Sequence, residues 1–350
     1  MRAPTISRVP TLAAFVGAGG AGPRDTPVKV GSVAGFQRRF GRGSSDLDQA
    51  AAQFFANGGV RAWIVRTDNL PGSKTAGTGL YALDRAARFN LLALPGVVDP
   101  AVQSAALDYA EARRAFVILD LPASVVDLAS ANAWLGAAAN LRRPNAAAYL
   151  PRLAEAGSGA IAGLYARTDA AKGVWTAPAG AQATLAGVTT LPAPLPQADI
   201  DQLGHSGLNV LRVLPAGGLV AWGARTLAGA DGRDPEWKYV PVRRLALFVE
   251  QSLDPGLQWA VFQPSGPPLW ALLRQACEAF LMGLFRDGAL QGARPSDAFF
   301  VRCGPDTMTP ADIAAGNLKV EIGIAPVRPA EFVIIRIGQW TDPDHPDHNP

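Results

Sequence analysis

The chain has 350 residues, of which 49% are hydrophobic and 17% are charged, and this composition excludes wholesale disorder. The formal net charge is only +3, and no run of five basic residues occurs, so the sequence lacks the basic patch of a typical nucleic-acid binder. The two cysteines, Cys277 and Cys303, exclude a disulfide scaffold and fit a protein made in a reducing compartment.

Short apolar runs alternate with helical patterns in the first part of the chain. A strand is predicted at 11–16, before a glycine cluster, and the residues preceding it are expected to be extended because Pro4 and Pro10 disfavour helix. Early acidic residues open a predicted helix at Asp46 that ends at Gly58-Gly59. The remaining elements of this part are strands at 60–66, 89–94 and 115–121 and a helix over 101–113. The alternation predicts a largely parallel sheet that is covered on both faces, and an α/β fold.

Residues 138–196 differ from the preceding part, because they are rich in Ala, Gly, Thr and Pro and show weak periodicity. We expect long, exposed loops with small strands there. Regular patterns return at about residue 199. They predict a strand pair at 208–214 and 219–222, helices at 242–253 and 267–285, and strands at 299–303, 320–325 and 331–337. The polar, proline-broken tail at 341–350 is expected to be disordered.

No signal peptide is recognisable at the N-terminus, because no charged segment leads into an apolar stretch. The most apolar stretches, such as 89–98, are too short to span a bilayer. The sequence therefore predicts a protein that is neither exported by the general route nor inserted into a membrane.

Residues Gly17 to Gly22 match the dinucleotide-binding pattern G-x-G-x-x-G after a strand. That function requires a helix to begin at the glycines, so that its N-terminus holds the pyrophosphate. Pro23 and Pro27 follow instead, and no acidic residue ends a second strand about twenty residues later. The pattern therefore favours a glycine turn over a cofactor site.

Other chemistry-bearing residues form no recognisable catalytic set. Asp99 and Asp120 follow apolar strands, where catalytic carboxylates often lie, but the prolines after them favour helix N-caps. His205 lies in a turn without a G-x-S-x-G nucleophile motif. Cys277 is expected in a helix core, and Cys303 has no CxxC partner. We therefore expect no enzymatic activity, no cofactor and no metal site.

The second half carries a specific series of motifs. In order, these are DPEWKYVPVRRL at 234–245, LQWAVFQP at 257–264, LW at 269–270, GALQG at 288–292, AFFV at 298–301, IGIAP at 322–326 and PAEFVIIRI at 329–337. In the first half, AFVG at 14–17, GP at 22–23, FG at 40–41, QFFANGG at 53–59 and AWIVR at 62–66 belong to the same series. Together these motifs resemble contractile tail sheath proteins, the family of sheaths in contractile phages, R-type bacteriocins and extracellular injection systems.

The resemblance implies a compact two-domain sheath fold of mixed α/β class. The expected parts are an N-terminal arm and first strand (1–22), an outer domain (23–198), a tube-facing C-terminal domain (199–340) and the tail (341–350). It also implies that strands are exchanged between subunits. The residues expected to take part are Ala3, Thr5, Ile6, Ser7, Arg8, Val9, Glu331, Phe332, Val333, Ile334, Ile335, Arg336 and Ile337.

The family function implied is mechanical: a helical homopolymer around an inner tube contracts and drives the tube through a target envelope. Implied partners are copies of the chain itself, the inner tube protein, baseplate and tail-terminator proteins and, in some particles, sheath paralogues. Tube contacts are expected among Arg243, Arg244, Arg274, Glu278 and Arg286, for which solvated faces and pairs within the subunit are equally good interpretations. The resemblance implies assembly in the bacterial cytoplasm, in a phage virion or a tail-like particle.

Two other classes of function stay open at this point. One is an α/β enzyme, either a hydrolase or a dinucleotide-binding oxidoreductase, which would be a small oligomer with a polar cleft. The other is a sheath-like cap or adaptor that does not polymerise alone. The sequence does not distinguish a phage from a bacteriocin or an injection system.

Overall fold

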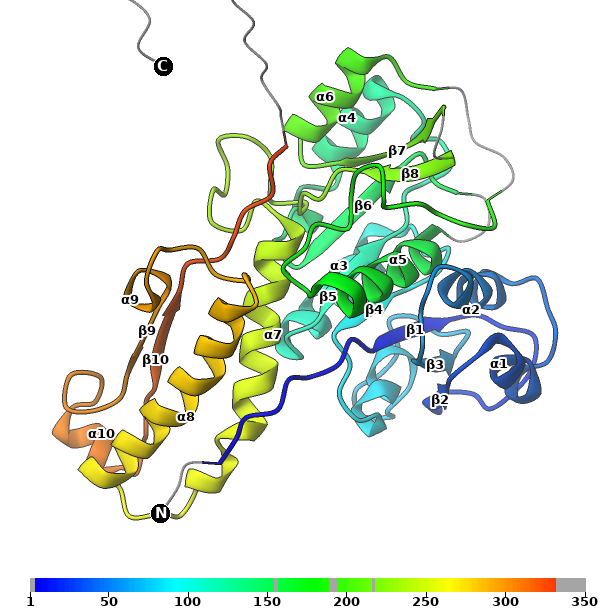
Figure 1. The fold of residues 1–350 in the computed structure, drawn as a ribbon. Helices are drawn as coiled ribbons and strands as arrows, with labels where there is room; N and C mark the ends of the chain where they lie inside the picture. Colours follow the sequence, from blue (N-terminus) through cyan, green and yellow to red (C-terminus); the bar gives the residue numbers. More distant parts are fainter. Residues whose placement is uncertain (1–3, 154–156, 189–193, 216–217, 332–350) are drawn as a thin grey trace, which may run out of the picture.

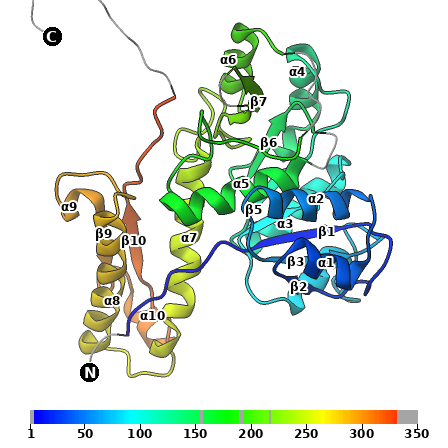
Figure 2. The same ribbon diagram turned by 45° about the vertical axis from the view of Figure 1, so that its right-hand side comes forward.

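The computed structural model describes residues 4–153, 157–188, 194–215 and 218–331 (Figures 1 and 2). They form a large α/β domain and a smaller domain that is built on two long helices. One of these helices, α7 (Val240–Gly256), is the part of the smaller domain that lies next to the large domain (Figure 2). The large domain contains a sheet with the strand order β2 (Val28–Val30), β3 (Ala62–Arg66), β1 (Ala13–Gly17), β4 (Leu91–Ala93), β5 (Phe116–Leu119), β6 (Ala146–Leu150), β7 (Asn209–Leu214) and β8 (Gly218–Trp222).

The sheet is parallel from β3 to β7, and the two edge strands β2 and β8 are antiparallel to their neighbours. Helices cover both of its faces, which explains why β1 is apolar at every position. Ala13 and Phe15 point into the core under one set of helices, and Ala14 and Val16 into the core under the other. The first set is α1 (Val33–Phe40), α2 (Asp46–Ala56) and α5 (Gly157–Lys172), and the second is α3 (Pro100–Ala112), α4 (Leu128–Ala137) and α6 (Gln197–His205).

Local signals account for most helix boundaries in this domain. Ser45 caps α2 in a capping box with Asp48, and Asn57 and the left-handed Gly58 end it. Asp99 accepts a hydrogen bond from the amide of Ala101 and caps α3, whose first residue is Pro100. The cap interpretation of Asp99 is therefore confirmed.

The expectation of exposed loops at 138–196 is wrong for β6 and α5, whereas residues 173–188 contain no helix or regular strand. β6 is buried throughout, and α5 is buried along its first ten residues. Gly159 and Gly163 lie against the backbone of α2, where a β-carbon would be within 2.3 and 2.4 Å of the carbonyl oxygens of Ala50 and Phe54. The many Ala and Gly residues of α5 made its periodicity weak in the sequence. The same small residues allow α5 and α2 to approach this closely.

The predicted domain boundary at 198/199 also disagrees with the topology. Strands β7 and β8 continue the large sheet, since Tyr149 and Leu150 of β6 pair with Asn209 and Val210. The large domain therefore extends at least to Trp222. The pattern of the β7–β8 hairpin indicated two strands correctly but contained nothing about which sheet they join.

The smaller domain contains α7, α8 (Pro267–Arg286) and a two-stranded antiparallel sheet of β9 (Phe299–Arg302) and β10 (Glu321–Ile324). Two short helices, α9 (Pro295–Ala298) and α10 (Pro310–Ala314), flank β9 in the sequence. One face of the sheet packs on the apolar side of α8 through Phe299, Val301, Ile322 and Ile324. Both helices have a proline in the first turn; α8 begins at Pro267 as predicted, and α7 begins at Val240, two residues before its predicted start.

Three short 3₁₀ helices complete the described elements: η1 (Gly79–Arg85), η2 (Ala139–Leu141) and η3 (Gln258–Ala260). The predicted strand 331–337 and the tail 341–350 lie outside the described residues, apart from Glu331. No described helix is long and apolar enough to cross a membrane.

Candidate functional site

The glycine motif after β1 forms a turn. The carbonyls of Gly19 and Gly22 accept hydrogen bonds from the guanidinium of Arg66, at 2.8 and 2.6 Å, and the next helix begins only at Val33. Without a helix N-terminus at the glycines, the geometry needed for a pyrophosphate is missing from this turn. The interpretation as a glycine turn is confirmed.

The remaining titratable candidates are structural. The carboxylate of Asp120 is buried and accepts hydrogen bonds from the amide of Gly96 and from the amide and hydroxyl of Ser158, so it fixes the first turn of α5. It is not the N-cap of the next helix in the chain, as Pro122 had suggested, because Asp127 caps α4. Burial raises the pKa of Asp120, and the three hydrogen bonds act against that increase.

The two cysteines are buried in different clusters, and burial raises the pKa of Cys277 to about 12. A thiol with this pKa is a poor nucleophile at neutral pH. Among the residues that the structure describes, no three His, Cys, Asp or Glu side chains gather to hold a metal ion.

The N-terminal segment 4–9 lies on the smaller domain of its own chain, beside α7 and α8 (Figures 1 and 2). Ile6 is 7% exposed and belongs to the same apolar cluster as Leu253 of α7 and Phe280 of α8. Arg8 forms an ion pair of 2.6 Å with Asp287, and the amide of Val9 donates to the hydroxyl of Ser252.

These contacts correct one expectation about the arm. The sequence predicted an extended arm, which the family resemblance assigned to contacts between subunits, and residues 4–9 are indeed without helix or strand. The arm nevertheless packs on its own subunit, because Ile6 fits against Gly256, where a β-carbon would come within 2.8 Å of it. Ala3 lies outside the described residues.

The sheet of β9 and β10 is the second candidate assembly surface. Its register pairs Phe299 with Ile324 and Arg302 with Glu321, and within the described residues no other strand joins either β9 or β10. The outer face carries Phe300, which is 44% exposed, stacked under the guanidinium of Arg302 at 4.8 Å. An isolated two-stranded sheet is marginally stable, so this one depends on α8 and has free edges for further strands.

The five predicted tube contacts are not equivalent. Arg244 is 4% exposed and forms a bidentate ion pair with Asp169 of α5, with N–O distances of 2.9 and 2.5 Å. It is therefore unavailable for a tube contact. Arg243 donates to the side-chain oxygen of Asn145 and stacks on Trp237, so the large domain also holds its guanidinium.

The three candidates on α8 are less enclosed. Arg274 is partly buried and donates to the carbonyl of Cys303, whereas Glu278 and Arg286 are exposed. The pattern of charged residues in the sequence did not separate these cases. Only the packing of α7 against α5 showed which arginines face inward.

Sequence reasoning missed the polar network that joins the two domains. Arg244 lies over the ring of Tyr165 at 4.8 Å, and the hydroxyls of Tyr165 and Tyr149 are 2.7 Å apart. Thr11 donates to the same carboxylate of Asp169 that binds Arg244. A buried network of this kind connects strands, helices and the N-terminal segment at the domain junction.

Two family models match the chain. The model of the phage tail sheath protein central domain matches residues 74–227, and the model of the phage tail sheath C-terminal domain matches residues 233–339. Together they span most of the chain and divide it after β8, where the large sheet ends. The chain belongs to the phage tail sheath family, and it is a structural sheath subunit.

The chain is also similar to individual members of that family. It is 29% identical to a protein of Pseudomonas aeruginosa (strain UCBPP-PA14) described as a prophage major tail sheath protein, over 75% of this chain and 70% of the relative. It matches the sheath of the extracellular contractile injection system PVC in the contracted state, with a TM-score of 0.84 and 28% identity over 96% and 94% of the two chains.

Two further structures show the same fold. The contracted helical sheath of the anti-feeding prophage AFP gives a TM-score of 0.79 at 27% identity, over 97% of this chain and 96% of that chain. A sheath tail protein of Listeria innocua is only 10% identical over 93% and 96% of the chains, with a TM-score of 0.60, and shows the fold alone. The expected two-domain sheath fold is therefore confirmed.

Proposed function

We propose that this chain polymerises helically around an inner tube and that the polymer shortens to drive the tube through a target envelope. The support is the similarity over almost the full chain to the PVC and AFP sheaths, which are described in the contracted state. Repetition of a contact whose rotation does not close builds such a filament. Rigid-body rotation between two packings of the subunits would supply the motion.

The observation that carries this proposal is the two-stranded sheet of β9 and β10. Within the described ranges no further strand pairs with β9 or β10, so an extended segment of another subunit could add to an edge of this sheet through main-chain hydrogen bonds. The segments proposed for this exchange are 3–9 and 331–337. Residues 4–9 lie on their own subunit, so exchange through them requires Ile6 and Arg8 to form their contacts on a neighbouring copy instead.

The exposed residues Glu278 and Arg286 of α8 are proposed to contact the inner tube. One acidic and one basic side chain on the same helix would pair with opposite charges on a tube surface. Further proposed partners are baseplate and tail-terminator proteins and, in some particles, sheath paralogues. The similarity to a chain of the AFP baseplate structure, with a TM-score of 0.78, supports contact with a baseplate.

We further propose that the subunit performs no catalysis and that it assembles in the bacterial cytoplasm as part of a phage or phage-tail-like particle. The membership in a structural family and the prophage relative support this proposal. The motion would then use the free-energy difference between two lattices and no nucleotide hydrolysis.

Negative-stain electron microscopy of the purified chain tests polymerisation directly. We expect long, hollow tubes with a regular helical lattice, in the lower-energy contracted geometry. Discrete small particles at high concentration would contradict an autonomous sheath and would favour a cap or adaptor role.

Deletion of residues 2–9 is expected to abolish ordered tubes while the subunit keeps its fold. The reason is that the arm is proposed to join subunits, although the loss of Ile6 also removes about 2 kcal/mol of apolar burial. Tubes would be counted by electron microscopy and folding checked by circular dichroism. The control variant Arg24→Ala keeps the arm and loses one exposed ion pair elsewhere on the subunit, so it should form tubes. Intact tubes from the truncated chain would refute exchange through the N-terminal arm.

A further inference from the structure

The last described residue, Glu331, lies on the large domain and away from the sheet of β9 and β10. After β10 the chain is bonded to the smaller domain only briefly, where the amide of Ala325 donates to Ala298 and that of Val327 to Ala289. It then crosses to the loop between β8 and α7 (Figure 1). Glu331 is therefore held by a different domain from β10, the strand that precedes it.

Arg225 binds the carboxylate of Glu331. Its guanidinium donates from Nε to Oε1 of Glu331 at 2.6 Å and from Nη2 to Oε2 at 2.7 Å. The side chain of Arg225 is only 2% exposed, and removal of a cation from water costs several kcal/mol unless the charge is paired. A planar guanidinium that binds a carboxylate through two parallel hydrogen bonds fixes both the position and the direction of its partner.

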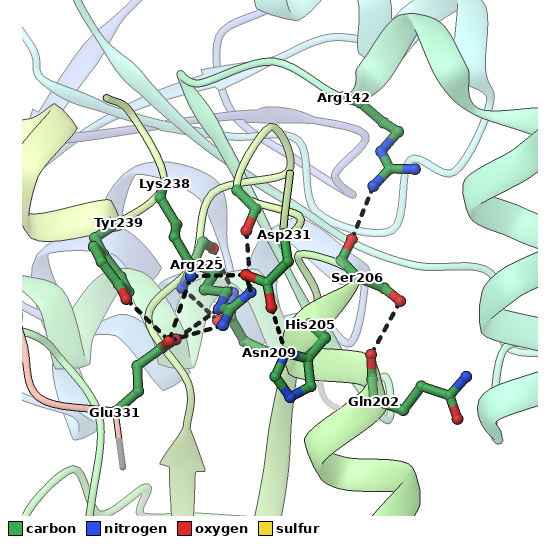
Figure 3. Close-up of polar contacts among 11 residues, drawn as sticks. Arg142, Gln202, His205, Ser206, Asn209, Arg225, Asp231, Lys238, Tyr239 and Glu331 are labelled. Atoms are coloured by element: carbon green, nitrogen blue, oxygen red, sulfur yellow. Dashed lines mark hydrogen bonds and ion pairs between the residues drawn. The ribbon is translucent and has the colours of Figure 1, made fainter. Parts of the chain in front are cut away.

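Neighbouring groups hold Arg225 and Glu331 in place (Figure 3). The side-chain amide of buried Asn209 bonds the backbone of Arg225 in both directions, at 2.7 and 2.9 Å. The hydroxyl of Tyr239 donates to Oε2 of Glu331 at 3.0 Å. Asp231 accepts from Nη1 of Arg225 at 2.9 Å and binds Lys238 at 2.7 Å, and His205 contacts the same carboxylate.

The charges in this cluster favour an ionised Glu331. Burial would raise the pKa of this carboxyl, but the hydrogen bond and the charge of Arg225 outweigh burial and lower it. Lys238 and His205 lower the pKa of Asp231 in the same way. Glu331 is thus held by a charge-assisted contact that is complete at neutral pH.

The position of this cluster gives it a role beyond local stability. Arg225, Lys238 and Tyr239 lie on the connection between the large sheet and α7. Glu331 therefore contacts the chain directly before α7, the first helix of the smaller domain. We propose that Glu331 is a positioning residue that, through Arg225, fixes the chain at the domain junction, directly before residues 332–337, which are proposed to join a neighbouring subunit. This inference rests on the proposed strand exchange.

The variant Glu331→Gln tests the inference, because it keeps the size of the side chain and removes its charge. Hydrogen–deuterium exchange should become about tenfold faster at Val327, whose amide is the last before Glu331 to donate a backbone hydrogen bond, and stay unchanged in β10. By electron microscopy of the same samples, tubes should lose their uniform helical lattice. The thermal midpoint should change little, because Arg225 keeps Asp231 and the carbonyl of Gly229 as acceptors.

The matched control is Glu236→Gln, the same change at an exposed residue of the same connection, which should leave exchange and lattice as in the wild type. If Glu331→Gln does not fold, Glu331→Asp replaces it, since the shorter carboxylate keeps the charge but cannot reach both guanidinium nitrogens. Wild-type exchange and wild-type tubes from these Glu331 variants would overturn the inference. Failure of the wild type itself to form tubes would refute the proposed function. Hydrogen–deuterium exchange would still decide whether Glu331 fixes the chain at the domain junction.

Discussion

Replacement of Arg244 with alanine is expected to lower the free energy of unfolding by about 3–5 kcal/mol. The substitution leaves the carboxylate of Asp169, which is 6% exposed, buried without its cation. It also removes the contact with the ring of Tyr165, so α7 loses its polar connection to α5. Urea denaturation followed by tryptophan fluorescence would measure the change.

Two further variants separate this explanation from a surface role. Arg286→Ala removes an exposed arginine from α8 and should change stability by less than about 0.5 kcal/mol. The double variant Arg244→Met with Asp169→Leu removes both charges and should recover most of the loss, because an apolar pair of similar volume can replace a buried ion pair. A stable Arg244→Ala subunit that fails only in tube contact would instead support the sequence-based expectation for this residue.

Gly159→Ala is expected to destabilise the subunit by about 2–3 kcal/mol, although alanine normally favours a helix. The added β-carbon would lie 2.3 Å from the carbonyl oxygen of Ala50 and 2.5 Å from its α-carbon. Because both atoms belong to the backbone of α2, the strain cannot be relieved by a change of rotamer, and the two helices must move apart.

Gly136→Ala is the matched control for this prediction. Gly136 also lies inside a helix, but a β-carbon there would meet no atom within 4 Å. The control should therefore gain up to about 1 kcal/mol from helix propensity. Equal effects of the two alanines on the unfolding midpoint would show that α2 and α5 do not pack this closely.

Most strands outside the middle region, and the helices α2, α3, α7 and α8, follow from apolar periodicity and from end signals, whereas β2, α1, α4 and α6 were not predicted. The fully apolar β1 and the capping box of α2 could be identified without knowledge of their neighbours, because both reflect local chemistry. The β7–β8 hairpin was identifiable for the same reason. The buried α5 was not, because a helix covered on all sides has no polar face to produce a periodic pattern.

The residues that were predicted to act in assembly also differ in how much the sequence shows about them. The motifs at 234–245 and 322–337 pointed to the sheath family, which both family models confirm. The same motifs contain Arg244 and Glu331, but their roles depend on partners 75 and 106 residues away in the sequence. Charge alone suggested the same role for Arg244 as for the exposed Arg286.

The sequence by itself determined the α/β class, most of the strands, the four helices α2, α3, α7 and α8, and membership in the sheath family, because each of these depends on local patterns or on contiguous motifs. Only the tertiary structure decided that the large sheet continues through β8, that Ile6 packs on its own subunit, and that Arg225 holds Glu331 at the domain junction. These features are contacts between segments far apart in the chain. Their free energies depend on burial and on the alignment of donors with acceptors, which exist only once the chain has folded.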